Sequence, residues 1–389
     1  MKHNFDEYVD RRNTDCWKWD AEGAKVKIPM GCADTDFKCP QPVIDAIAKK
    51  AELGIYAYGY QPDSYYNSIV KWYKTRHEVN VDKDWLSFSP GVMVGLKLIL
   101  DAFTRPGDNV ITQPPVFHNF NHTISRIGRV NVENNLLFKE NKYYIDFEDL
   151  EKKAADPRTR LLVLCHPHNP IGRAWTREEL NRISDICIRN NVLVVSDECH
   201  SDIVYGANKH IPFFSLSEEA AHNSITICSG SKTFNIHGFY TSYVIIPDKT
   251  LHDQFDLSFA NHHLDFNFFG VEALSTAYDK CDYYVDQMLD YLKGNITYLK
   301  KFLMENMPEV ALIEPEATYL VWIDFGKWGL SNDELEKFFF NAGVGLNKGS
   351  KFSGYSDGFM RMNIACTRST LEEALQLIKK QYDIVIKTK

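Results

Sequence analysis

The 389-residue sequence lacks features that mark several classes of protein. No apolar run approaches the ~20 residues of a membrane-spanning helix, and the first residues are polar where a signal peptide would be apolar. The nine cysteines include no C-x-x-C pair and no Cys/His group at zinc spacing. We therefore expect a cytoplasmic protein without a membrane span, structural disulfides or a metal site.

An excess of basic charge is also missing. The 44 Lys and Arg against 52 Asp and Glu give a net charge of −8, which argues against a nucleic-acid binder. Neither a G-x-G-x-x-G nor a G-x-x-x-x-G-K-[ST] nucleotide-binding motif occurs. Hydrophobic residues at 44% and charged residues at 25% are ordinary values, so composition indicates a folded globular protein.

Strand, loop and helix alternate through the middle of the chain. Near-continuous apolar strands are predicted at 160–165, 191–196 and 224–228, and an amphipathic helix with a capping-box start is predicted over 176–190. Strands that are apolar throughout are typical of a parallel sheet covered by helices on both faces. The fold class predicted is α/β with a mostly parallel sheet.

The pattern changes after about residue 280. A long helix over 282–304 precedes strands at 318–325 and 359–364, in the order of an α+β unit. The chain is also long enough for two domains at ~100–200 residues each. We predict a large domain over 51–285 and a smaller one built from both chain ends, residues 1–50 and 286–389.

Polar residues follow three of the apolar strands. Because parallel strands end at one edge of a sheet, these residues should meet there. They are Asn169 after the first strand, Asp197 and His200 after the second, and Ser229, Ser231 and Lys232 after the third. Taken singly, each has a structural explanation as a turn residue, a helix cap or a surface side chain.

Together they have the chemistry of a pyridoxal 5′-phosphate (PLP) site. A shielded lysine can form a Schiff base with an aldehyde, and an aspartate can hold a pyridine nitrogen protonated. A helix that begins at Gly91, Val92 and Met93 offers N–H donors to a phosphate, beside the hydroxyls of Ser229 and Ser231. Asn169 and His200 can hydrogen-bond the ring oxygen, and Phe117 can stack on the ring.

Seven short motifs along the whole chain resemble those of a known family. They are Ala33-Asp34-Thr35-Asp36-Phe37, Tyr58-Gly59-Tyr60, Pro90-Gly91-Val92, Asn169-Pro170-Ile171-Gly172, Ser196-Asp197-Glu198-Cys199-His200, the stretch from Ser229 to Asn235, and Arg361-Met362-Asn363. The chain is similar to fold-type I PLP enzymes of the class I/II aminotransferase family. The resemblance is strongest to the cystathionine β-lyase-like (C–S lyase) branch, which includes a maltose-regulon modulator.

The resemblance implies roles for single residues. Lys232 would bind the cofactor covalently and Asp197 would pair with its pyridine nitrogen. Arg361, with Asn169 and Asp34, would bind an amino-acid substrate through its carboxylate. Tyr60 would reach the phosphate of a neighbouring subunit in a homodimer.

The resemblance also implies an activity. We predict a cysteine-S-conjugate β-lyase that releases thiol, pyruvate and ammonia from cystathionine-like substrates. An aminotransferase acting on an L-amino acid is the alternative. A regulatory protein that binds a transcription activator is an alternative of another class.

Three positions depart from the family pattern. Tyr240 stands where ordinary aminotransferases have a phosphate-binding arginine, which favours the lyase branch. Phe117 stands where that branch has a tyrosine, and the neighbouring His118 is a candidate replacement for the missing hydroxyl. Gly31-Cys32 replaces a Trp-Val pair, so the substrate pocket loses a bulky wall and substrate size or identity is expected to differ.

Overall fold

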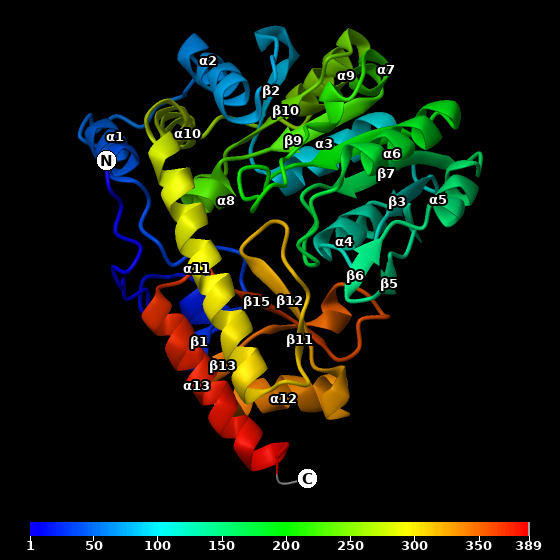
Figure 1. Cartoon of the computed structure of the whole chain (residues 1–389). Helices are drawn as coiled ribbons and strands as arrows, with labels where there is room; N and C mark the ends of the chain where they lie inside the picture. The colour runs from blue at the N-terminus through cyan, green and yellow to red at the C-terminus, as the bar shows by residue number, and fades with distance from the viewer. Residues whose placement is uncertain (388–389) are drawn as a thin grey trace.

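A computed structural model describes residues 1–387 (Figure 1). Its centre is a seven-stranded sheet in the order β2-β10-β9-β8-β7-β3-β4. Only β10 pairs antiparallel to its neighbours, so the sheet is mostly parallel, which confirms the predicted α/β class. The strands are β2 (Leu86–Ser89), β10 (Ser242–Ile245), β9 (Ser224–Cys228), β8 (Leu193–Asp197), β7 (Thr159–Cys165), β3 (Asn109–Thr112) and β4 (Val130–Glu133).

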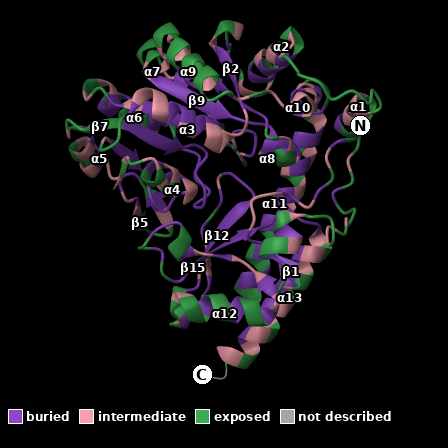
Figure 2. Ribbon diagram, turned by 180° about the vertical axis from the view of Figure 1, so that it is seen from behind, coloured by how far each residue is buried: buried purple, intermediate pink, exposed green. Residues whose placement is uncertain are grey.

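Helices cover both faces of this sheet because its strands are apolar on both sides. In β7, Leu161 and Val163 pack into one buried cluster, whereas Leu162 and Leu164 pack into another on the opposite face. The first cluster is closed by α3 (Val92–Phe103), α4 (Asn119–Arg126) and α9 (Lys249–Asn261). The second is closed by α5 (Phe147–Ala154), α6 (Arg177–Arg189) and α7 (Glu218–His222). Figure 2 shows the sheet as a buried layer between these helices.

The predicted central elements lie where the sequence pattern places them. The strands predicted at 160–165 and 224–228 are β7 and β9. Helix α6 begins with the predicted capping box, in which Thr176 accepts from the Glu179 N–H and the Glu179 carboxylate accepts from the Thr176 N–H. One detail differs: Asp197 is the last residue of β8, not the first residue after it.

A second, antiparallel sheet lies below the first in Figure 1, in the order β11-β12-β15-β14. Its strands are β11 (Ala311–Leu312), β12 (Leu320–Asp324), β15 (Phe359–Asn363) and β14 (Asn347–Lys348). The neighbouring helices are α11 (Asp282–Asn306), α12 (Asn332–Ala342) and α13 (Arg368–Val385). The long helix α11 runs from beside the large sheet down to this second sheet.

The N-terminal segment lies against the C-terminal part of the chain. Strand β1 (Ile28–Pro29) pairs in parallel with β13 (Val344–Gly345), and the Asn363 N–H donates to the Met30 carbonyl. The two ends of the chain therefore lie side by side. The domain boundaries at residues 50 and 285 stay a proposal.

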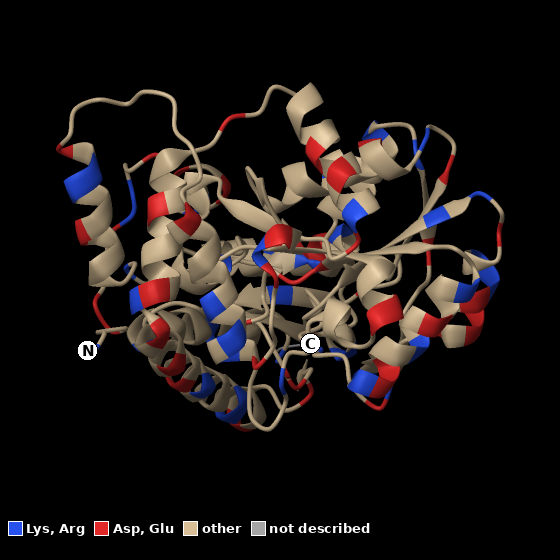
Figure 3. Ribbon diagram, turned by 90° about the horizontal axis from the view of Figure 1, so that it is seen from above, with Lys and Arg blue, Asp and Glu red and all other residues tan. Residues whose placement is uncertain are grey.

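The remaining elements lie around the large sheet. Helices α1 (Gln41–Ala51) and α2 (Asp63–Trp72) both pack on α10 (Phe268–Lys280). A hairpin joins β5 (Leu137–Lys139) to β6 (Lys142–Tyr144), and the short α8 (Ser231–Phe234) follows β9. Within residues 1–387, none of the helices has the length and apolarity to span a membrane. Both basic and acidic residues occur on the outer helices (Figure 3).

Candidate active site

The predicted residues meet at the carboxyl edge of three neighbouring parallel strands. Asp197 ends β8, Asn169 lies in the loop after β7, and Lys232 lies on α8 just after β9. The Lys232 Nζ donates to the carbonyl oxygen of Ala33 at 2.8 Å, so the N-terminal segment closes over this edge. The Tyr319 hydroxyl donates to the same carbonyl at 3.0 Å.

Asp197 is a buried carboxylate without a salt bridge among the described residues. Its Oδ1 accepts from the Cys199 N–H at 3.1 Å. Burial raises the pKa of Asp197, while the charge of Lys232 opposes that rise. A cation placed against this carboxylate would therefore be held strongly.

Arg361 on β15 is a buried guanidinium that has no acidic partner in residues 1–387. Its Nη1 donates to Asn169 Oδ1 at 3.0 Å and its Nη2 donates to the Gly31 carbonyl at 2.7 Å, while Nε is buried without a partner. The guanidinium lies 4.8 Å from the ring centre of Phe352. Burial lowers the pKa of Arg361 to about 10. A buried, unpaired guanidinium favours an anionic ligand.

Asn169 and His200 lie next to these charges. The Asn169 Oδ1 accepts from Arg361, which leaves the amide N–H groups for a ligand. His200 is buried and its Nδ1 has no partner in the part of the chain described. Burial, followed by the charges of Lys232 and Arg361, lowers the pKa of His200 to about 3, so its ring is neutral.

The start of α3 is open to an anion. Gly91 has a φ of +104° and no side chain caps the helix. The Gly91 N–H already donates to the Ser89 carbonyl and the Ser242 hydroxyl, so the free donors of the first turn begin at Val92 and Met93. Tyr240, at the position of the family arginine, lies beside this turn: its Cδ1 is 3.8 Å from where a Cβ on Gly91 would lie.

Ser229 and Ser231 are buried beside α8. The Ser229 hydroxyl donates to the Thr241 carbonyl at 2.7 Å and accepts from the Ser231 N–H at 3.1 Å. The hydroxyl proton of Ser229 is therefore engaged within the protein. A phosphate-binding role for both serines stays a prediction.

Phe117 and His118 are half-buried at the start of α4. Phe117 contacts the His118 ring edge-on, with centroids 5.3 Å apart, and His118 in turn contacts Phe352. Burial, then the charges of Arg361, His122 and Lys351, lowers the pKa of His118 to about 4. His118 is thus a neutral ring near the arginine, able to accept a hydrogen bond through its unpartnered Nδ1.

The carboxylate of Asp34 is held by ion pairs within the N-terminal arm, which we define as residues 11–36. Its Oδ2 lies 2.7 Å from Arg11 Nη2, and its Oδ1 lies 3.5 Å from the buried Lys18 Nζ. Burial raises the pKa of Asp34, but Lys18 and Arg11 more than offset this and hold it below its usual value. These contacts favour a positioning role for Asp34, which keeps Ala33 over Lys232; direct contact with substrate stays a prediction.

The sequence reading missed several residues of this edge. Asn363 donates to the carbonyl oxygens of Cys32 and Asp34 at 2.6 and 2.5 Å, and Asn235 donates to those of Thr35 and Phe37 at 3.0 and 3.1 Å. Both asparagines stand in quoted motifs, Arg361-Met-Asn and Lys232-Thr-Phe-Asn, so the signal was present. Arg11 and Lys18 belong to no motif.

Tyr60 lies apart from this constellation. It stands between α1 and α2 and is 76% exposed. Residues 1–387 leave most of it uncovered, and its reach toward a neighbouring subunit stays a prediction.

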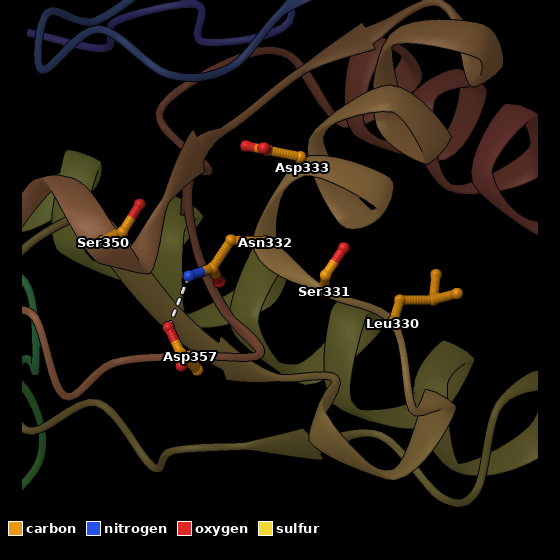
Figure 4. A pocket seen from close by; sticks show the side chains of 6 residues that line it. All are labelled: Leu330, Ser331, Asn332, Asp333, Ser350 and Asp357. Carbon is orange, nitrogen blue, oxygen red and sulfur yellow. Dashed lines mark hydrogen bonds between the residues drawn. The ribbon is translucent and has the colours of Figure 1, made fainter.

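Two surface cavities lie elsewhere. One of about 480 Å³ opens at the start of α12 and is lined by Leu330, Ser331, Asn332, Asp333, Ser350 and Asp357 (Figure 4). The Asn332 amide donates to Asp357 across it. Another of about 710 Å³ lies between Glu78 and His222. Neither is lined by a predicted site residue, so the candidate site rests on the convergent side chains at the sheet edge.

No group of three metal-ligating side chains occurs over residues 1–387.

Comparison with known proteins identifies the family. The family model described as aminotransferase class I and II matches residues 25–378. The cystathionine beta-lyase PatB of Bacillus subtilis (strain 168) is 39% identical over 97% of this chain and 99% of its own length. Protein MalY of Escherichia coli (strain K12) is 29% identical over 96% of this chain and 97% of its own length.

Solved structures are similar over the same extent. The PLP-containing cystalysin of Treponema denticola superposes with a TM-score of 0.96 at 31% identity, over 99% of this chain and all of that one. The PLP-bound C–S lyase of Staphylococcus hominis gives a TM-score of 0.91 at 32% identity, over 98% of each chain. The predicted fold-type I architecture is confirmed. The chain belongs to the aminotransferase class I and II family.

Proposed function

We propose that this protein is a PLP-dependent carbon–sulfur lyase that acts on cystathionine-like cysteine S-conjugates. The observation that carries the proposal is the juxtaposition of Lys232 and Asp197 with a buried arginine that has no acidic partner within residues 1–387. Relatives named cystathionine beta-lyase and C–S lyase support the same activity. The products would be a thiol, pyruvate and ammonia.

The side chains of this edge suit PLP. The buried Asp197 carboxylate needs a positive partner, which a protonated pyridine nitrogen would provide. The uncapped first turn of α3 offers N–H groups of Val92 and Met93 to a phosphate. Lys232 carries the amine, His200 has an unpartnered Nδ1, and Asn169, whose Oδ1 accepts from Arg361, has its amide N–H groups left for the ring oxygen.

Each of these residues has a task in the elimination. Arg361 binds the substrate carboxylate and so fixes the orientation of the Cα–H bond. The Lys232 amine removes the Cα proton as general base. When bound, PLP supplies an electron sink for the charge left at Cα. The Asp197 carboxylate keeps the pyridine nitrogen protonated, which maintains that sink.

The proposal extends to the oligomeric state and the cellular location of the protein. We propose a homodimer in which Tyr60 of one subunit reaches the phosphate site of the other. The 76% exposure of Tyr60 and the exposed Tyr56 and Tyr58 beside it support this arrangement. We further propose a cytoplasmic location, in keeping with nine free cysteines.

An assay with L-cystathionine separates the lyase from an aminotransferase of the same family. The lyase releases pyruvate without any added 2-oxo acid. A strict requirement for a 2-oxo acid, with no thiol released, would replace the lyase by an aminotransferase. The protein should be reconstituted with PLP before the assay, so that cofactor loss is not mistaken for inactivity.

A further inference from the structure

Glu22 directs an unpaired carboxylate at the space beside Gly31. Glu22 ends the helical turn Trp17–Glu22 on the N-terminal arm. Its Oε1 lies 3.1 Å from the position that a Cβ on Gly31 would occupy. In the part of the chain described, residues 1–387, this carboxylate has no salt bridge and no hydrogen bond.

This space borders the arginine that we assign to the substrate carboxylate. The Gly31 carbonyl accepts from Arg361 Nη2 at 2.7 Å and from Asn347 Nδ2 at 2.8 Å. A Cβ on Gly31 would also lie 3.3 Å from the Asn347 amide, which is tighter than ordinary van der Waals contact, so the absence of a side chain lets Glu22 and Asn347 lie this close to the Gly31 backbone.

The charge of Glu22 affects the pKa values of two neighbouring groups, Cys32 and Arg361. It adds to burial and Asp34 in raising the pKa of the Cys32 thiol. It also opposes the burial that lowers the pKa of Arg361. Glu22 is exposed, so a substrate group that extends past Arg361 would meet a hydrated negative charge rather than an apolar wall.

Resting on the proposed function, we infer that Glu22 and Gly31 select the sulfur substituent of the substrate. The class favoured is a cysteine S-conjugate whose substituent ends in an amine, because the ammonium gains attraction from Glu22. A substituent that ends in a carboxylate is repelled. Gly31 contributes because a Cβ there would lie 3.1 Å from the Glu22 Oε1, so a side chain at this position would displace the carboxylate.

Three substrates of similar length test this inference in the PLP-loaded protein. S-(2-aminoethyl)-L-cysteine carries a cation, S-carboxymethyl-L-cysteine an anion and S-propyl-L-cysteine no charge. In Glu22→Gln, the ratio of kcat/KM for the cationic over the anionic substrate should fall about tenfold, while the neutral substrate changes less than about twofold. Raising the ionic strength should shrink the same ratio in the unmodified protein.

A charge reversal and a distant control sharpen the result. Glu22→Lys should favour the anionic substrate, whereas Glu218→Gln on the exposed start of α7 should leave all three rates as they are. An unchanged ratio in both Glu22 variants, with normal turnover of the neutral substrate, would overturn the inference. Absence of pyruvate from every substrate with the unmodified protein would instead contradict the proposed function.

Discussion

The Lys232 Nζ lies 2.8 Å from the carbonyl oxygen of Ala33, 199 residues earlier in the chain. This hydrogen bond joins the edge of the large sheet to the N-terminal arm. The arm is itself fixed by a buried ion network, since Asp34 and Asp36 pair with Arg11 and Lys18. The amine is thus held in place by the fold before any ligand binds.

Replacing Lys232 by Ala should abolish turnover. The variant loses both the amine that binds the cofactor and the base that takes the Cα proton, so we expect the rate to fall by about 10³-fold or more. The absorbance of the protein-bound cofactor should change as well. Lys249→Ala, which replaces an exposed lysine on α9, is the control and should retain activity.

The same variant tests the regulatory alternative. If a regulatory effect on a protein partner persisted in Lys232→Ala, regulation would be independent of catalysis.

Arg361→Lys should weaken substrate binding more than it slows the chemical step. Lysine keeps the charge but cannot form two parallel hydrogen bonds with a carboxylate, so we expect KM to rise about thirtyfold. Steady-state kinetics with L-cystathionine would measure this change. Arg177→Lys on the exposed start of α6 serves as control, and a KM equal to that of the unmodified protein in Arg361→Lys would remove Arg361 from the carboxylate site.

The meeting of three predicted side chains at one sheet edge could be read from the sequence because its signals are local. Apolar strands followed at once by Asn169, Asp197 and Lys232 are visible in the sequence, and parallel strand order then places the three side chains together. The antiparallel β10 was not foreseen, because a four-residue stretch such as Ser242–Ile245 carries no signal of strand direction.

The N-terminal arm was beyond prediction for a different reason. Arg11 lies in a loop and Lys18 in the short helical turn Trp17–Glu22, and neither segment has a periodic pattern that would indicate pairing with Asp34 and Asp36. The acceptor of Lys232 is a backbone carbonyl, which any residue provides. The position of Glu22 beside Gly31 could not be predicted from the sequence either, since only the folded arm brings the two residues together.

Lys18→Met should destabilise the fold. The Lys18 Nζ is 2.8 Å from Asp36 Oδ2 and its side chain is only 2% exposed, so its loss leaves the partly buried carboxylates of Asp34 and Asp36 short of a cation. We expect the free energy of unfolding to fall by about 3 kcal/mol. Urea unfolding followed by the fluorescence of the seven tryptophans, one of which (Trp19) donates to Asp36, would measure it.

The matched control for that variant is Lys27→Met. Lys27 pairs with Glu373 at the surface, where the two side chains are 62% and 49% exposed. Removing such a pair should cost less than about 1 kcal/mol. Equal losses in the two variants would mean that the buried network contributes no more than a surface pair.

Buried His168 should make the fold sensitive to acid. Burial, with smaller effects from Arg173 and His166, lowers the pKa of His168 to about 3 from its ordinary value of 6.5. Between these two values the unfolded chain binds a proton that the folded protein does not, so the free energy of unfolding falls as pH drops through this range. At higher pH both states are neutral at this residue, and its effect on the pH dependence vanishes.

His168→Gln tests that linkage. Between pH 4 and pH 6, the slope of the free energy of unfolding against pH should be smaller in this variant. The decrease should correspond to about one proton fewer taken up on unfolding. Urea titrations at several pH values would give the slope. A slope identical to that of the unmodified protein would show that His168 does not contribute to the acid sensitivity.

The central claim is β-elimination from a cysteine S-conjugate, and the product balance tests it most directly. The PLP-loaded protein should convert L-cystathionine and water into homocysteine, pyruvate and ammonia in equal amounts, with no 2-oxo acid added. Formation of a 2-oxo acid from the substrate without release of thiol, and only in the presence of an amino-group acceptor, would contradict it.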